Sequence, residues 1–132
     1  MDIGKYRQEL RVLFDDEREL IETFLVIRGL VKGGIYKTKL KCGKKGCKCE
    51  RGELHEVWMH YRSEGGKAKT RTIRKEEVQE YERYTRNYQR YRQSRAELIK
   101  LHKKQIRLID LIEEGLRKEN SGIEKKLFKK KR

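Results

Sequence analysis

Three cysteines fall within eight consecutive positions of this chain, and a histidine follows six residues after the last of them. The spacing Cys-x4-Cys-x-Cys-x5-His supplies three thiolates and one imidazole, the ligand set of a closed tetrahedral zinc site. Glycines between the cysteines permit a tight backbone path, and the lysines between them favour the ionised thiolate. We therefore predict a Zn²⁺ ion bound by Cys42, Cys47, Cys49 and His55.

His60 is the alternative fourth ligand, although strand alternation places it in the middle of a strand. A redox role is disfavoured because the chain has no Cys-x-x-Cys pair. A catalytic zinc is disfavoured because such sites keep an open position and use a carboxylate base, although Glu50, Glu53 and Glu56 are close in sequence. The cysteines are thus interpreted as a structural metal site.

Composition limits the size of any core that could surround this site. Of 132 residues, 35% are hydrophobic and 43% are charged, which predicts a small centre with protruding amphipathic helices. The absence of proline suits long uninterrupted helices. No apolar run approaches the ~20 residues of a membrane span, the N-terminus lacks a signal peptide, and an odd cysteine number argues against disulfides, so a cytoplasmic protein is expected.

Hydrophobic periodicity predicts a first helix over residues 3–31, ended by Gly33-Gly34. Alternation then predicts strands at 35–42, 55–62 and 68–74, with a glycine turn at 63–67. The fold class predicted is α+β: an N-terminal helix, a small three-stranded antiparallel sheet carrying the zinc-bound cysteine loop, and a long coiled-coil-like C-terminal helix.

The long helix is predicted from 76 to about 118. A heptad fits its apolar positions, with polar residues between a tyrosine half and an aliphatic half. The first heptad position is Tyr81, Tyr88, Arg95, His102, Ile109 and Leu116, and the second is Tyr84, Tyr91, Leu98, Gln105 and Ile112. The tyrosines are interpreted as packing residues rather than catalytic ones, because the metal-bound or Arg/His partners of such chemistry are missing.

Net charge divides the chain into four segments: 1–32, 33–75, 76–119 and a basic tail at 120–132 expected to be disordered. The segment 33–75 holds 13 basic and 4 acidic residues, so most of the net charge of +15 lies around the cysteines and in the tail. Concentrated Lys and Arg are typical of a protein that binds a polyanion, since they release counterions from phosphates.

The strands and loop therefore carry the predicted nucleic-acid contacts, with the basic side chains on phosphates and an aromatic ring, Trp58 or Tyr36, on a base or sugar. An ordinary solvated face, with Trp58 in the core, is the alternative interpretation. The predicted contacts are Lys37, Lys39, Lys41, Lys44, Lys45, Lys48, Trp58, Lys69, Arg71, Arg74, Arg86 and Arg90.

From about Arg28 to Leu98 the chain resembles a small prokaryotic family of unknown function with the signature CGKxGCxC followed by a histidine. The matching elements are Arg28-Gly29, the cysteine block 42–49, Gly52 to His55, the aromatic strand 57–61, Gly65-Gly66-Lys67 and Asn87-Tyr88-x-x-Tyr91. Glu56-Val57 replaces the family's Gly-Pro. The resemblance implies an association with mobile genetic elements.

The function predicted is non-catalytic nucleic-acid binding, to DNA or RNA, by an accessory subunit of a mobile-element or RNA-guided system. The alternative is an oligomeric protein-interaction module built on the long helices, as a homo-oligomer or with a protein partner. A metal-dependent nuclease ranks third, and no membrane partner is expected.

Overall fold

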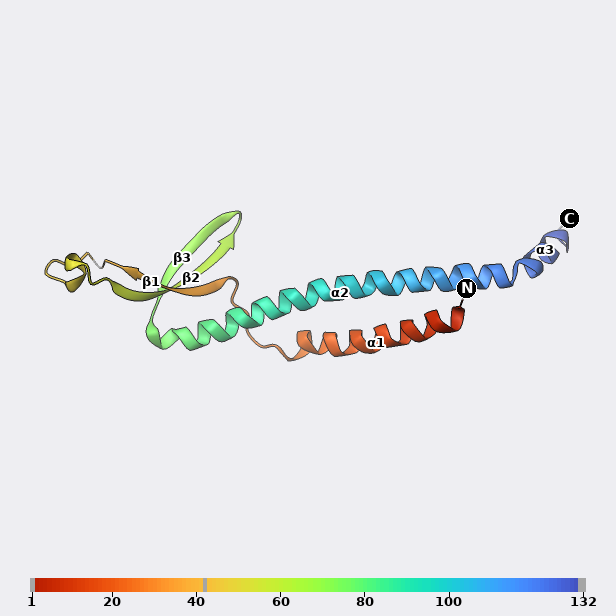
Figure 1. Cartoon of the computed structure of the whole chain (residues 1–132), viewed down its shortest axis with the longest axis horizontal. Coiled ribbons are helices and arrows are strands. Elements are labelled where there is room, and N and C mark those ends of the chain that lie inside the picture. The colour runs from red at the N-terminus through yellow and green to blue at the C-terminus, as the bar shows by residue number, and fades with distance from the viewer. Residues whose placement is uncertain (1, 42, 131–132) are drawn as a thin grey trace. The chain divides into compact units, whose positions relative to one another are not determined.

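The computed structural model describes residues 2–41 and 43–130, with the side chains of Cys49, Lys129 and Lys130 left out. It has the expected α+β class, with an N-terminal helix, a three-stranded antiparallel sheet and a long helix. The elements are α1 (Ile3–Val26), β1 (Gly34–Leu40), the 3-10 turn η1 (Lys48–Arg51), β2 (His55–Glu64), β3 (Lys67–Ile73), η2 (Lys75–Glu77), α2 (Val78–Glu119) and α3 (Ser121–Lys130) (Figure 1).

The chain divides into two compact units that are continuous through α2. We call residues 26–93 the β unit, and residues 1–25 with 94–132 the helical unit. None of the helices in the described part of the chain combines the length and apolar character that crossing a membrane requires.

The sheet of the β unit has the order β1-β2-β3, with both neighbouring pairs antiparallel. Its hairpin between β2 and β3 turns on Gly65 and Gly66, both at positive φ, as a tight two-residue connection requires. Ile35 lies opposite His60 and His60 lies opposite Arg71, so alternation puts these three residues on one side of the sheet.

The first part of α2 packs on this side of the sheet, which we call the helix-facing side. The His60 ring lies 5.0 Å from the ring of Tyr81 on α2, and His60 and Ile73 are both 4% exposed. Trp58 lies opposite Ile73 and is half-buried. The opposite, open side carries Tyr36 and Tyr61 and is covered by no helix among the described residues of the β unit.

Helix α1 ends at Val26, five residues before the predicted end. Gly29, at φ 79°, packs so closely on the Tyr84 ring that a Cβ would lie 2.7 Å from it. The Val31 amide donates to the Tyr84 carbonyl, and Asn87 donates to the Arg28 and Gly29 carbonyls. These hydrogen bonds to α2 replace the helical ones, which is why the chain leaves the helix early.

In the helical unit α1 runs antiparallel beside the second part of α2 (Figure 1). Their contact, which we call the seam, has the spacing of three and four residues that a helix pair needs. The seam consists of Leu10, Leu13, Glu17, Leu20 and Phe24 on α1, and Leu98, Leu101, Gln105, Leu108 and Ile112 on α2.

One of the two predicted heptad positions is wrong in this unit. Arg95, His102 and Ile109 are exposed, and the residue before each of them is buried or half-buried instead: Ser94, Leu101 and Leu108. A regular heptad alternates steps of three and four residues, but the buried positions take two successive steps of three, at Tyr88, Tyr91 and Ser94. From Ser94 on, this position of the seam therefore lies one residue earlier than the heptad predicts. Leucines at 101 and 108 then fill it better than a histidine would.

The predicted disordered tail is instead the helix α3 over residues 121–130. Ile123 and Leu127 are four residues apart and line a cavity with Ile109, Ile112 and Leu116 of α2. The Glu124 amide donates to the Asn120 carbonyl, and this bond starts the helix.

Candidate metal loop and nucleic-acid surface

The cysteine loop connects β1 to β2 and is built by turns. Gly43 and Gly46 have φ of 76° and 79°, so the tight backbone path predicted at these glycines uses the left-handed conformation. The Gly46 amide donates to the Glu50 carboxylate at 3.3 Å, and the Glu50 amide donates to the Cys47 carbonyl at 3.1 Å. The second bond belongs to η1, which follows Cys47 directly.

The loop brings two of the predicted ligands together. The Sγ atom of Cys47 lies 2.8 Å from Nε2 of His55, at the first position of β2. Thiolate sulfur and imidazole nitrogen are both ligand types that Zn²⁺ takes, so this pair supplies two of the four ligands of a tetrahedral site. Cys42 and the side chain of Cys49 lie outside the described residues. Within the described part of the chain, no three His, Cys, Asp or Glu side chains converge as a metal site.

His60, the alternative ligand, is placed differently. It is buried on the helix-facing side of the sheet, and its Nε2 lies 2.8 Å from the Lys32 carbonyl oxygen. A carbonyl only accepts, so Nε2 is the donor and carries a proton. The structure thus gives His60 a core role and leaves His55 beside the thiol.

The Glu56 carboxylate, next to His55 in the sequence, is held in an ion pair. Glu56 lies 2.9 Å from Lys37, and the hydrogen bond and charge of this ammonium lower the pKa of Glu56. Lys39 lowers the pKa further. Glu56 therefore stays ionised to lower pH than usual, which makes it a poor general base.

The predicted basic side of the sheet forms two groups rather than one surface. Lys37 and Lys39 lie toward the cysteine loop, whereas Lys69 and Arg71 lie toward the β2–β3 hairpin. His60 lies between the groups, where α2 packs. The central positions of this side are therefore used for packing.

The basic residues also differ in whether they form ion pairs with acidic side chains. Lys37 pairs with Glu56, Lys69 with Glu64 at 3.4 Å, and Arg71 with Glu77 at 3.7 Å. In the described chain, five exposed lysines at the loop end have no acidic side chain within ion-pair distance. We call them the free lysines: Lys39, Lys41, Lys44, Lys45 and Lys48.

The arginines predicted to contact nucleic acid lie apart from the loop in sequence. Arg74 precedes η2, and its amide donates to the Glu77 carboxylate at 3.1 Å. Arg86 pairs with Glu82 at 2.6 Å on the surface of α2, and Arg90 is exposed one turn further on. Arg86 is thus partly neutralised.

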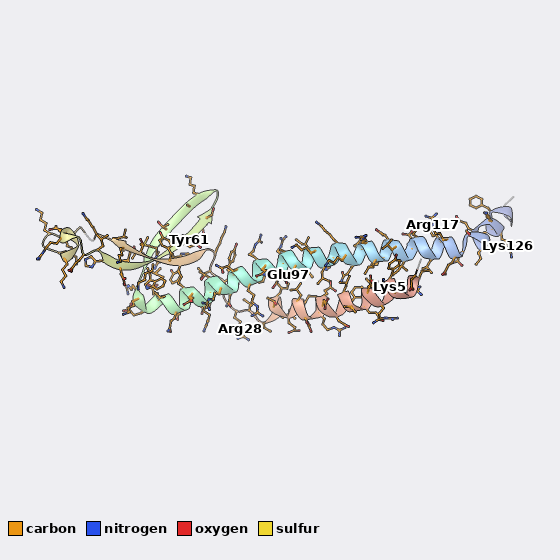
Figure 2. All side chains as sticks on the ribbon, viewed as in Figure 1. Lys5, Arg28, Tyr61, Glu97, Arg117 and Lys126 are labelled. Carbon is orange, nitrogen blue, oxygen red and sulfur yellow. The ribbon has the colours of Figure 1, made fainter. Side chains whose placement is uncertain are left out.

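The aromatic residues show one pair that sequence reasoning missed. Trp58 is half-buried on the helix-facing side, with the Lys37 ammonium 5.9 Å from its ring centroid. On the open side, the rings of Tyr36 and Tyr61 lie 5.8 Å apart and both are exposed. Tyr61 is labelled at the sheet in Figure 2. Only strand register pairs residues this far apart in sequence, so the alternation pattern gave no signal for Tyr61.

Comparison with known proteins identifies a family for most of the chain. Residues 5–83 match DUF6788, a domain of unknown function. This agrees with the resemblance to a family of unknown function, although the matched region begins earlier and ends earlier than residues 28–98. No curated protein and no solved structure matches the chain.

Proposed function

The chain belongs to the DUF6788 family, and on that premise we propose that its β unit binds DNA or RNA without catalysis, mainly through the phosphate backbone. The observation that carries the proposal is the cluster of five free lysines at the cysteine loop. A Zn²⁺ ion held by Cys42, Cys47, Cys49 and His55 would fix the loop that presents them. The accessory role in a mobile-element or RNA-guided system is part of the same proposal and rests on the resemblance alone.

The free lysines suit phosphates because none of them is held in an ion pair, although Glu56 lies across the strand from Lys39. A lysine that is already paired, such as Lys37 with Glu56, must break its pair before it can bind a phosphate. An unpaired lysine releases a counterion on binding without that cost. The loop end of the sheet therefore supports phosphate contact better than the hairpin end does.

The open side of the sheet adds a second kind of contact. Tyr36 and Tyr61 are 40% and 46% exposed, and exposed rings on a sheet can stack on unpaired bases. Stacking is tolerant of sequence because every base has an aromatic face. This supports single-stranded nucleic acid as the ligand, with backbone contacts from the loop.

The test is the salt dependence of binding, measured with a fluorescent single-stranded DNA and an RNA of the same sequence. The variant replaces Lys44, Lys45 and Lys48 with Gln. We expect the slope of log K against log salt to fall by about 2, because each lost phosphate contact removes about 0.7 for a single strand.

A control variant makes the same charge change in the helical unit, by Lys118→Gln, Lys125→Gln and Lys126→Gln. It should leave the slope nearly unchanged. Equal losses from both variants would show that binding follows net charge and not the loop. Affinity that is absent, or flat between low and moderate salt, would remove the proposal.

A further inference from the structure

The helical unit carries an apolar surface outside its seam. Six large apolar residues of this unit are between 37% and 69% exposed, and each follows a seam residue by one position. We call them the outer apolar face: Phe14, Ile21 and Leu25 on α1, and Ile99, Ile106 and Ile109 on α2. Ile109, at one end of this face, shares a cavity with Ile123 and Leu127 of α3, and it still remains 43% exposed.

The six residues share one side of the helix pair. A step of one residue turns a helix by about 100°, and in two antiparallel right-handed helices the same step leads from the seam to the same side. His102 marks this side, because it follows Leu101 and its Nε2 lies 2.6 Å from Oε1 of Glu17. The helices are antiparallel, so residue numbers fall along α1 as they rise along α2 from that contact. This places Phe14 beside Ile106 and Ile21 beside Ile99.

Other contacts support the same register. Leu13 and Leu108 line one cavity, and Leu20 and Leu101 line another. Both cavities lie on the opposite side of the helix pair from the outer apolar face. Val12 precedes its seam residue, so it lies on that opposite side, although it is 49% exposed.

Charge along the two helices is complementary level by level. Residues 15–22 hold five acidic residues and one basic residue, whereas residues 100–107, which lie beside them, hold four basic and none acidic. In the neighbouring segment of the helix pair, α1 is basic and α2 is acidic. Residues 5–11 hold three basic residues and one acidic, and residues 110–114 hold three acidic and none basic.

We propose that a second copy of the chain docks on the outer apolar face to form a four-helix bundle. A two-fold axis parallel to the helices would place each α1 beside the partner copy's α2 at the same level. Acidic segments then meet basic ones in both bands, around a centre of apolar residues. A two-fold axis perpendicular to the helices would set the acidic segments of the two α1 helices against each other, so charge selects the first arrangement.

Sedimentation equilibrium of the full chain tests the proposal. The chain has a mass of 16.0 kDa, so we expect a species of twice that mass at micromolar concentration. Ile106→Glu puts a charge in the centre of the interface and should return the protein to the monomer mass. Val12→Glu makes the same kind of change on the opposite side and should leave the dimer intact, with helix content checked for both by circular dichroism.

A charge exchange tests the arrangement of the helices. Arg7 and Glu113 lie at the same level on the two helices and are both exposed. Arg7→Glu and Glu113→Arg should each raise the dimer dissociation constant, by about threefold to tenfold, and the double variant should restore it. A monomeric parent protein, a dimer that Val12→Glu disrupts as much as Ile106→Glu, or a double variant weaker than either single one would overturn the proposal.

Discussion

The two units of this protein differ in what they leave exposed. The β unit holds 19 basic and 8 acidic residues, whereas the helical unit holds 17 and 13, so the β unit carries most of the excess charge. The β unit also contains every cysteine and six of the seven tyrosines. It exposes unpaired lysines and tyrosine rings, whereas the helical unit exposes apolar side chains and a smaller excess of positive charge.

The difference shows two ways of stabilising a unit that has little apolar material. In the β unit, positive-φ glycines, hydrogen bonds to α2 and the proposed zinc hold the sheet. In the helical unit, a repeated seam of leucines holds two helices, and this needs no special backbone. A small sheet with exposed charge suits a polyanion, and a helix pair with a spare apolar face suits another helix pair.

The largest expected effect comes from removing the metal. Purified protein should contain about one zinc per chain, and Cys47→Ser or chelation should remove it and unfold β1 and β2, because binding and folding of such a loop are coupled. Metal analysis measures the zinc content, and amide NMR signals report whether each unit is folded. Signals from the helical unit should survive, which separates the two units.

Lys48→Ser, one residue further on, is the matched control and should keep both metal and sheet. A chain that is fully folded in its β unit without metal would contradict the zinc proposal. The proposal that the free lysines bind nucleic acid would still stand, and the salt dependence of binding would still test it.

The second effect compares two glycines with nearly the same φ. Gly33 is at 96° and Gly52 at 98°, but a Cβ on Gly33 would lie 1.8 Å from the Tyr61 carbonyl oxygen, whereas Gly52 has open space around it. Gly33→Ala should lower the free energy of unfolding by about 3 kcal/mol or more, from backbone strain and overpacking together.

Gly52→Ala adds backbone strain without overpacking, so it should lower the free energy of unfolding by about 1–2 kcal/mol. Both values follow from urea unfolding with tryptophan fluorescence, since Trp58 lies in the sheet. Equal costs for the two variants would mean that the 27–33 segment does not pack under Tyr61.

The smallest effect belongs to the helical unit. Gln105 is 6% exposed, and among the described side chains its Nε2 is buried without a hydrogen-bond partner. Gln105→Leu should raise the stability of this unit by about 1–2 kcal/mol, because an unmade hydrogen bond in the seam is replaced by an apolar contact.

Urea unfolding followed by helical circular dichroism measures this gain, with Gln89→Leu as an exposed control on the same helix. The control should stay within about 0.5 kcal/mol of the parent. A loss of stability in Gln105→Leu would mean that the amide has a partner in solution.

Much of the fold could be predicted because local patterns decide it. Alternation and the Gly65-Gly66 turn give the three strands to within two residues, and the long helix begins and ends close to its predicted limits. The end of α1 could not be predicted, because it depends on a hydrogen bond from Val31 to Tyr84, 53 positions away in sequence. The prediction of which α2 residues lie in the seam was also wrong in part. The partner helix decides whether Leu101 or His102 faces inward, and a heptad count does not include the partner.

The candidate site divides in the same way. Spacing in the loop predicted that a thiol and an imidazole would meet, and Cys47 and His55 do. Counting lysines predicted a basic surface but could not show that Lys37 and Lys69 are paired while Lys39 and Lys44 are not. Strand register alone does not decide it, because Glu56 lies directly across from Lys39 and yet pairs with Lys37 on the neighbouring diagonal.

The contact between Glu17 and His102 joins residues 85 positions apart, and the whole β unit lies between them in the sequence. At a synthesis rate of ~5–20 residues per second, α1 waits roughly 4–17 s for its partner to be made. The enclosed unit can therefore complete its sheet first, while the leucines of α1 are still uncovered. A nascent chain of this protein should need a chaperone at its first helix and not at its lysine-rich loop.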